Sequence, residues 1–257
     1  MKKLFIAFAL TSALFSCKKV TTNTNSTTNT SNGVTCVDNP NINFTSIGTP
    51  VGKFSDCIKD IDGNVYKTVI IGTQTWMAEN LKTSKYNDGT SIPNVKDSLD
   101  WIKLTTGAWC YYNNDEKNNS KYGKLYNWYS VNSTSNGNKN VCPTGWHVPT
   151  NSEWTVLTDY LGGDSIAGGK MKEVGTMSWN SPNTGATNTS LFTGLPGGYR
   201  GNDGDNYFVI GDYCYWWSRE SVHPYQAGFC GLSLGSGDAY LSYMPKLLGF
   251  SVRCLKD

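Results

Sequence analysis

The sequence predicts an α+β fold with two main helices beside short antiparallel sheets and long loops. Apolar side chains recur at helical spacing in the middle of the chain, over residues 122–131 and 151–161. Beyond residue 190 the chain instead divides into short strand-like runs separated by turn residues. Charged residues make up only 16% of the chain. Glycine, asparagine, serine, threonine and tyrosine are abundant, which is typical of a loop-rich protein outside the cytoplasm.

The N-terminus predicts export and attachment to a lipid bilayer. Lys2 and Lys3 precede an apolar run over residues 4–15, which is too short to span a bilayer as a mature helix. The run ends in LFSC, which matches the bacterial lipobox, so we expect residues 1–16 to be a signal peptide and Cys17 to carry lipid. The alternative is an ordinary signal peptide cut nearby, with Cys17 unmodified. The expected location is the cell envelope, as an outer-membrane lipoprotein facing the periplasm or the surface.

Two segments are expected between the anchor and the main domain. Residues 17–33 are mostly threonine, asparagine and serine and have little apolar surface to bury, so we expect a lipid-anchored, disordered tether. Residues 34–57 form an N-terminal extension with Cys36 near its start and Cys57 near its end. A bridge between these two cysteines is one option, but the sequence leaves their pairing open.

The formal charge argues against a nucleic-acid partner. The chain has 22 Lys+Arg and 20 Asp+Glu, so loss of Lys2 and Lys3 with the signal peptide leaves 20 of each. A neutral chain has no basic field to attract nucleic acid and no polybasic segment to hold an anionic membrane. The lipid on Cys17 is therefore the expected membrane contact.

The main domain, residues 58–257, is expected to open with a β-hairpin. Asp62-Gly63 lies between two alternating runs, and this dipeptide is a strong hairpin signal. Asp60, Asp62 and Asn64 also offer oxygen ligands for calcium. However, an EF-hand loop needs glycine at position six and glutamate at position twelve, whereas Gly63 falls at position four. We therefore expect a turn here rather than a calcium loop.

Three segments then show helical spacing. Residues 122–131 predict a short helix. A longer helix is predicted after Thr150, which can form a capping box with Glu153, and Gly162-Gly163 would end it. Another short helix is predicted near residues 166–174. The remaining chain predicts strands and loops, in the runs LFTGLPGGYR, NYFVIG, YCYWWS, AGFCGLSL, AYLSYM and GFSVRCLK.

Ten blocks in this order resemble the Fibrobacter succinogenes major paralogous domain, over about residues 58–257. Among them are DIDGNVYKTVIIGTQTWMAENL, GAWCYYNND, YGKLYNWYSV, VCPTGWHVPTNSEWTVLTDYLGG, LPGGYR, YWWSRES and GFSVRCLKD. That family is similar to the C-type-lectin-like superfamily, which also contains the formylglycine-generating-enzyme type of domain. The resemblance implies a C-type-lectin-like fold and an exported protein or lipoprotein. It implies no established activity.

The same resemblance implies a disulfide pairing. In the C-type-lectin-like fold a disulfide ties the first-helix region to the last strand, which here implies Cys142–Cys254. Cys214 and Cys230 flank the predicted hairpin YCYWWSRESVHPYQAGFC and are candidates for a second bridge. Cys110 lies in a strand-like aromatic run and is expected to be a buried free thiol.

The resemblance also gives a test for calcium. Sugar-binding lectins of that superfamily hold calcium with E-P-N or Q-P-D and W-N-D motifs. Here Ser181-Pro182-Asn183 replaces the first ligand with serine, and W-N-D is absent, so the site would lose an oxygen donor. The loop with Asp203 and Asp205 is rich in oxygen ligands, but such loops are usually turns. We expect no cofactor and no metal, with calcium kept as the alternative.

The residues give little support for catalysis. His147 and His223 are the only histidines, too few for a three-histidine metal site, and His147 is expected to be structural. The sequence has no G-x-S-x-G elbow, no P-loop and no G-x-G-x-x-G fingerprint. A Ser-His-Asp arrangement stays open because triads are recognised by geometry. We expect the protein not to be an enzyme.

The remaining hypothesis is non-catalytic binding of an extracellular glycan or envelope protein. The alternatives are a structural cell-envelope component and, further back, a diverged enzyme. Sugars bind on aromatic faces with polar groups beside them. The residues predicted to combine these properties are Tyr199, Arg200, Trp216, Trp217, Arg219 and Glu220. The competing interpretation is that these segments are simply core and turn.

Overall fold

The computed structural model describes residues 30–31, 34–35 and 49–257. The expected signal peptide, the lipidated Cys17 and Cys36 lie outside the described residues. Within the described part of the chain, no helix is both long enough and apolar enough to cross a membrane. Thr30–Ser31 (β1), inside the expected tether, pairs antiparallel with Val34–Thr35 (β2).

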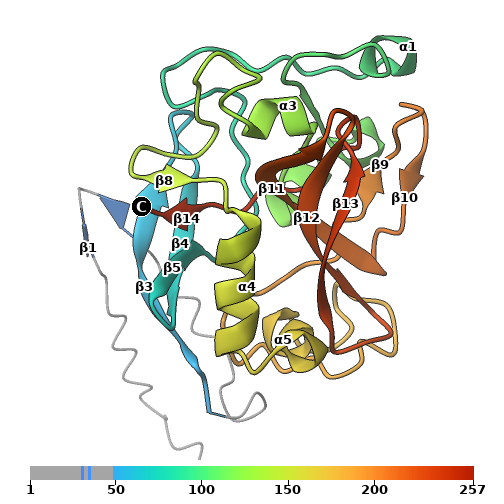
Figure 1. The fold of residues 1–257 in the computed structure, drawn as a ribbon. Helices are drawn as coiled ribbons and strands as arrows, with labels where there is room; N and C mark the ends of the chain where they lie inside the picture. Colours follow the sequence, from blue (N-terminus) through green and yellow to red (C-terminus); the bar gives the residue numbers. More distant parts are fainter. Residues whose placement is uncertain (1–29, 32–33, 36–48) are drawn as a thin grey trace, which may run out of the picture.

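The larger sheet joins the first part of the domain to its last strand (Figure 1). Its five strands run in the order β3-β4-β5-β14-β8, and every neighbouring pair is antiparallel. They are β3 (Gly52–Lys59), β4 (Val65–Ile71), β5 (Gln74–Met77), β14 (Leu255–Lys256) and β8 (Trp146–His147). The expected hairpin at Asp62-Gly63 is confirmed as the β3–β4 turn. Because β3 already begins at Gly52, pairing crosses the expected domain start at residue 58.

A second sheet has three strands in the order β11-β12-β13. They are β11 (Tyr213–His223), β12 (Gln226–Ser233) and β13 (Ala239–Pro245). Two smaller ladders complete the described strands: β6 (Trp109–Cys110) with β7 (Leu125–Tyr126), and β9 (Tyr199–Arg200) with β10 (Tyr207–Phe208). The architecture is therefore α+β with small antiparallel sheets, as the sequence predicts.

In Figure 1 the first main helix, α4 (Asn151–Tyr160), lies between the two larger sheets, and the second, α5 (Asp164–Met171), lies below it in contact with α4 and β13. The predicted capping box is present, because the Thr150 hydroxyl accepts from the Glu153 N–H and the Glu153 carboxylate accepts from the Thr150 N–H. The predicted helix near residues 166–174 exists but is shifted toward the N-terminus. Shorter helical pieces are α1 (Ser98–Trp101), the 3₁₀ turn η2 (Tyr112–Asn114), α2 (Asn118–Tyr122) and α3 (Trp128–Val131).

The single helix predicted over residues 122–131 is wrong. Gly123 takes a positive φ of 74° and ends α2. A Cβ at Gly123 would come within 2.7 Å of the Leu81 carbonyl oxygen, so the position requires glycine. The chain then pairs as β7, and Asn127 starts α3 by accepting from the Ser130 N–H. Tertiary pairing therefore overrides the helical spacing of this segment.

All nine tryptophans of the sequence are buried. They are divided among three apolar clusters. The largest holds Trp109, Trp128, Trp146 and Trp217; the second holds Trp76, Trp154, Trp179 and Trp216; and Trp101 anchors a smaller third one. The many tryptophans therefore form part of the apolar core and not a ligand-binding surface.

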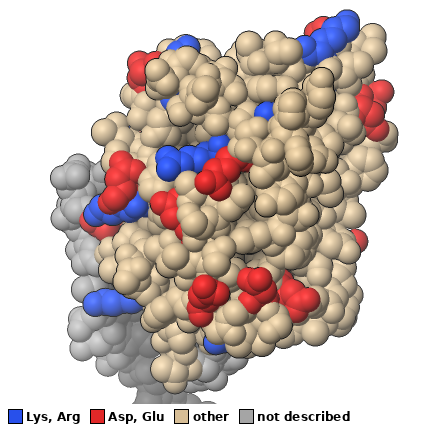
Figure 2. Space-filling view, viewed as in Figure 1, with Lys and Arg blue, Asp and Glu red and all other residues tan. Residues whose placement is uncertain are grey.

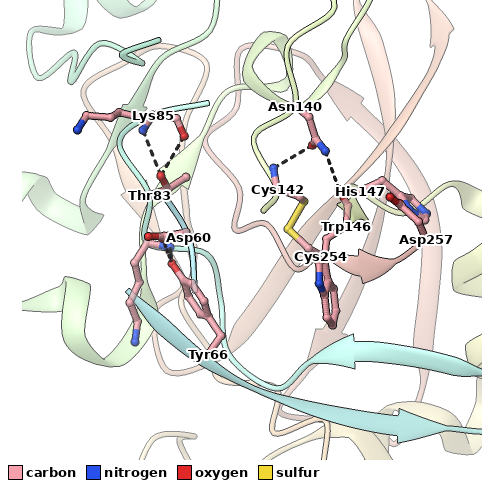
Figure 3. Close-up of a disulfide and its surroundings, with 11 residues drawn as sticks. Asp60, Tyr66, Thr83, Lys85, Asn140, Cys142, Trp146, His147, Cys254 and Asp257 are labelled. Atoms are coloured by element: carbon pink, nitrogen blue, oxygen red, sulfur yellow. Dashed lines mark hydrogen bonds and ion pairs between the residues drawn. A yellow bond between two sulfur atoms is a disulfide. The ribbon is translucent and has the colours of Figure 1, made fainter. Parts of the chain in front are cut away.

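The disulfide Cys142–Cys254 is present, with Cα atoms 5.9 Å apart (Figure 3). Asn140 holds the chain beside it, accepting from the Cys142 N–H and donating to the Trp146 carbonyl. The bridge ties the segment before β8 to the segment before β14. Cys57 is also disulfide-bonded, and Cys36, the partner considered as one option above, lies outside the described residues.

The predicted Cys214–Cys230 bridge is wrong, because both thiols are free and buried. In the β11–β12 register Cys214 lies opposite Leu232 and Cys230 lies opposite Trp216. The two cysteines therefore share a sheet face as diagonal neighbours, roughly 7–8 Å apart. A disulfide needs Cβ atoms within about 4.5 Å. Cys110 is a buried free thiol, as expected.

Candidate binding cleft

The two tryptophans predicted to stack on a ligand are unavailable to one. Trp216 and Trp217 are both 0% exposed. As neighbours on β11 they point to opposite faces of the strand and enter different core clusters. Their indole N–H groups are also occupied, by the Asn80 side chain at 2.8 Å and by the Tyr126 carbonyl at 2.7 Å. The prediction that these residues form a ligand site is therefore wrong.

Arg200 is likewise a structural residue and not a surface ligand group. Its side chain is fully buried, and its guanidinium lies 4.1 Å from the centre of the Trp101 ring. The guanidinium donates to the backbone carbonyls of Val95, Lys96 and Gly204 at 2.6–2.9 Å. Arg200 therefore holds two loops together from inside.

Arg219 and Glu220 are exposed at the end of β11 and line a shallow polar cleft of about 430 Å³. Glu220 accepts from the Asn151 N–H at 2.9 Å, so this carboxylate lies at the start of α4. The other lining residues are Asn132, Ser133, Thr134, Asn151, Ser221 and Val222. None of these lining residues, all from the described part of the chain, is aromatic.

Tyr199 instead lines a separate cleft of about 280 Å³, which we call the aromatic cleft. Its walls come from β9, β10, β11, the end of β13 and the segment that follows β13. The lining residues are Tyr199, Gly201, Asn202, Asp203, Phe208, Tyr215, Met244, Pro245, Leu248 and Phe250. The structure therefore distributes the six predicted residues over two clefts and the core.

The rings of the aromatic cleft form a corner. Tyr199 stacks on Phe208 with centroids 5.1 Å apart. The ring of Tyr199 stands nearly perpendicular to the rings of Tyr215 and Phe250, at 86° and 88°. Tyr215 and Phe250 in turn stack on each other at 4.9 Å. Two parallel pairs of rings therefore meet at a right angle.

Local pairing explains how the sequence builds this corner. Tyr199 and Phe208 lie directly opposite each other in the β9–β10 ladder, which brings their rings together. Gly201 permits the tight connection, because a Cβ there would come within 2.7 Å of Asp203 Oδ1 and 2.9 Å of the Phe208 ring. The strand-like alternation of NYFVIG and YCYWWS was the signal in the sequence that could have indicated Phe208 and Tyr215.

Among the described residues, Asp203 is the only charged one that lines the aromatic cleft. Its carboxylate accepts from the Asn206 side chain at 2.7 Å and from the backbone N–H groups of Asp205 and Asn206. The hydrogen bond from the Asn206 side chain lowers the pKa of Asp203, so the group is ionised at neutral pH. Burial raises the pKa of Tyr199, and the nearby Asp203 charge raises it further. The cleft therefore combines aromatic walls with one negative charge at its rim.

Some of the candidate calcium ligands are engaged by the protein itself. The amide nitrogen of Asn183 donates to the carbonyls of Glu173 and Gly175, whereas its buried Oδ1, the atom that would bind a cation, has no hydrogen-bond partner among the described residues. Asp60 accepts from the Asn64 side chain and the Tyr66 hydroxyl. Among the described residues no group of three or more histidine, cysteine, aspartate or glutamate side chains is arranged to hold a metal ion.

His147 lies between two carboxylates, of which Asp257 is labelled in Figure 3. Its Nδ1 is 2.6 Å from Asp257 Oδ1, and its Nε2 is 2.9 Å from Glu153 Oε1. Both ring nitrogens therefore face carboxylates, which leaves neither one for a serine nucleophile. His147 instead connects β8 to α4 and to the residue that follows β14. His223 lies exposed at the end of β11.

Comparison with known proteins gives one match. The model of the Fibrobacter succinogenes major domain matches residues 69–256, a range that contains the whole aromatic cleft and the Cys142–Cys254 disulfide. No curated protein and no solved structure matches the chain.

Proposed function

The chain belongs to the Fibrobacter succinogenes major domain family, and from this premise we propose that it is an exported lipoprotein with a non-catalytic binding domain. Its ligand is an extracellular glycan or protein, and its site is the aromatic cleft. Lipid on Cys17 anchors it to the outer membrane, facing the periplasm or the surface. The observation that carries the proposal is the corner of four rings with a carboxylate at its rim.

The chemistry of the cleft supports binding. Ligand sites are typically concave and mostly apolar, with a few polar groups that orient the ligand. Here Phe208 is 37% exposed and Met244 is 40% exposed, so apolar surface is open to solvent beside Asn202 and Asp203. On the face drawn in Figure 2 the basic side chains are scattered among acidic ones, which gives no support to a nucleic-acid partner.

We further propose that the domain has a C-type-lectin-like arrangement. Three features support it. The last strand, β14, pairs with β5 and β8 of the first part of the domain. The Cys142–Cys254 disulfide ties the segment before α4 to the segment before that strand. A separate sheet of long strands, β11–β13, follows the two main helices.

A glycan array and a pull-down of envelope proteins, both with the purified full chain, test the binding role. We expect saturable binding that Phe208→Ala abolishes and Tyr225→Ala preserves. Tyr225 is a suitable control because it is 81% exposed and does not line the cleft. Binding should survive EDTA, since no described cluster of side chains suits a metal ion. If Phe208→Ala retains binding, the site lies elsewhere in the protein. If neither a glycan nor a protein binds saturably, a structural role in the envelope is favoured.

A further inference from the structure

The aromatic cleft offers negative electrostatic potential and no positive charge. The faces of aromatic rings carry partial negative charge and attract cations. Within the part of the chain that the structure describes, four rings line the cleft, Asp203 lies at its rim, and none of the lining residues is lysine, arginine or histidine. A ligand group that complements this lining is cationic and apolar at once.

The carboxylate supplies charge rather than hydrogen-bond acceptors. Asp203 Oδ1 already accepts from two backbone N–H groups, and Oδ2 accepts from the Asn206 side chain. A carboxylate offers about four lone-pair positions, so most of them are taken. A primary ammonium brings three N–H donors that need acceptors, whereas a quaternary ammonium brings none. The occupied carboxylate therefore favours a cation without N–H groups.

The size of the cleft also favours a compact ligand group. Drug-sized ligands occupy pockets of roughly 300–1,000 Å³. At about 280 Å³ the aromatic cleft suits one compact group rather than a run of sugar residues. Phe208 is 37% exposed, so its ring can contact such a group, whereas Tyr215 and Phe250 stack on each other and are 9% and 1% exposed.

We propose that the aromatic cleft binds a quaternary ammonium group, of the trimethylammonium type carried by choline. This inference rests on the proposed function, because it names the chemical group that the proposed site receives. A glycan or protein ligand would present this group as a substituent.

Choline and its neutral isostere test the proposal directly. The isostere is 3,3-dimethylbutan-1-ol, in which a carbon atom replaces the nitrogen of choline. Its shape and apolar area match those of choline, but it carries no charge. Titrations of the full chain, followed by calorimetry and by tyrosine ring NMR shifts, should show saturable choline binding on the order of millimolar affinity. The isostere should bind roughly fivefold or more weakly, as expected for cation–π attraction.

Two variants separate charge from shape. Asp203→Asn keeps an oxygen acceptor for the loop but removes the charge, so it should weaken choline binding and leave isostere binding unchanged. Phe208→Leu keeps apolar bulk but removes a ring, so it should also lower choline affinity. Asp159→Asn removes an exposed charge on α4, away from the cleft lining, and should change neither affinity.

Three outcomes would overturn the proposal: equal affinity for choline and the isostere, a failure of choline to bind saturably, or normal choline binding by the Asp203→Asn variant. These outcomes leave the proposed function standing if a glycan or protein still requires Phe208. Loss of that requirement would instead overturn the proposed function.

Discussion

At the residue scale, the buried basic side chains support loop backbone. Five of the described basic residues are buried. Each of them lies 4.1–5.3 Å from the centre of an aromatic ring and donates to backbone carbonyl groups. They are Lys124, Lys172, Arg200, Lys246 and Arg253. Within the described part of the chain none of them forms a salt bridge. Long loops leave carbonyls that no sheet or helix pairs, and unpaired buried carbonyls are costly.

Arg200 gives the clearest test of this role. Arg200→Met keeps an apolar stem over Trp101 but leaves the carbonyls of Val95, Lys96 and Gly204 without their donor. We expect the free energy of unfolding in urea to fall by about 3 kcal/mol or more. Arg219→Met, at an exposed position, should change it by less than about 0.5 kcal/mol. Similar small changes in both variants would contradict the structural role of Arg200.

Asp62 predicts a pH dependence of stability. Burial tends to raise its pKa, but hydrogen bonds from Ser84 and the pairing with Lys85 prevail and lower it from 3.8 to about 2. A carboxyl whose pKa is lower in the folded state stabilises the fold above pH 4 and loses that contribution as pH falls toward 2. Urea titrations between pH 4 and pH 2 should show a shallower loss of stability in Asp62→Asn than in the wild type. An unchanged slope would contradict the assignment.

At the scale of elements, the Cys142–Cys254 disulfide joins the segments that precede two short strands, β8 and β14. β8 and β14 contain two residues each, and the bridge spans a sequence separation of 112 residues. Closing a loop of that length removes about 4–5 kcal/mol of chain entropy from the unfolded state, in the chain-entropy model.

We therefore expect Cys142→Ala, Cys254→Ala and the double variant to lose similar stability, because removal of either cysteine opens the same loop. Urea unfolding of the three variants measures this, and the expected loss is about 4 kcal/mol. Cys110→Ala serves as a comparison because Cys110 is a free thiol. A double variant that loses twice as much as either single variant would show that packing, not loop closure, dominates.

At the scale of the whole molecule, the tryptophans predict how the protein responds to a quencher. All nine are buried, so iodide should quench native fluorescence several times less steeply than fluorescence in guanidinium. Ligand binding in the aromatic cleft should also leave the quenching of tryptophan unchanged, since the cleft is lined by tyrosine and phenylalanine. Strong native quenching would contradict the assignment of Trp216 and Trp217 to the core.

The sequence predicts features that depend on local chemistry. The capping box at Thr150 and Glu153 predicts α4, because both groups lie within one turn. Asp62-Gly63 predicts the first hairpin because a tight turn needs these residue types. The pairing of Cys142 with Cys254, implied by the family resemblance, and the α+β class are confirmed as well.

Only the tertiary structure decides which face of a strand meets solvent, and this determines which residues line the aromatic cleft. The first part of β11, residues 214–218, is buried on both faces, so its tryptophans enter two cores while Tyr215 reaches the aromatic cleft. The register of β11 with β12 separates Cys214 from Cys230, and pairing with β6 turns part of an apparent helix into β7. Each outcome depends on partners distant in sequence, because burial and register are properties of packed surfaces that local spacing does not specify.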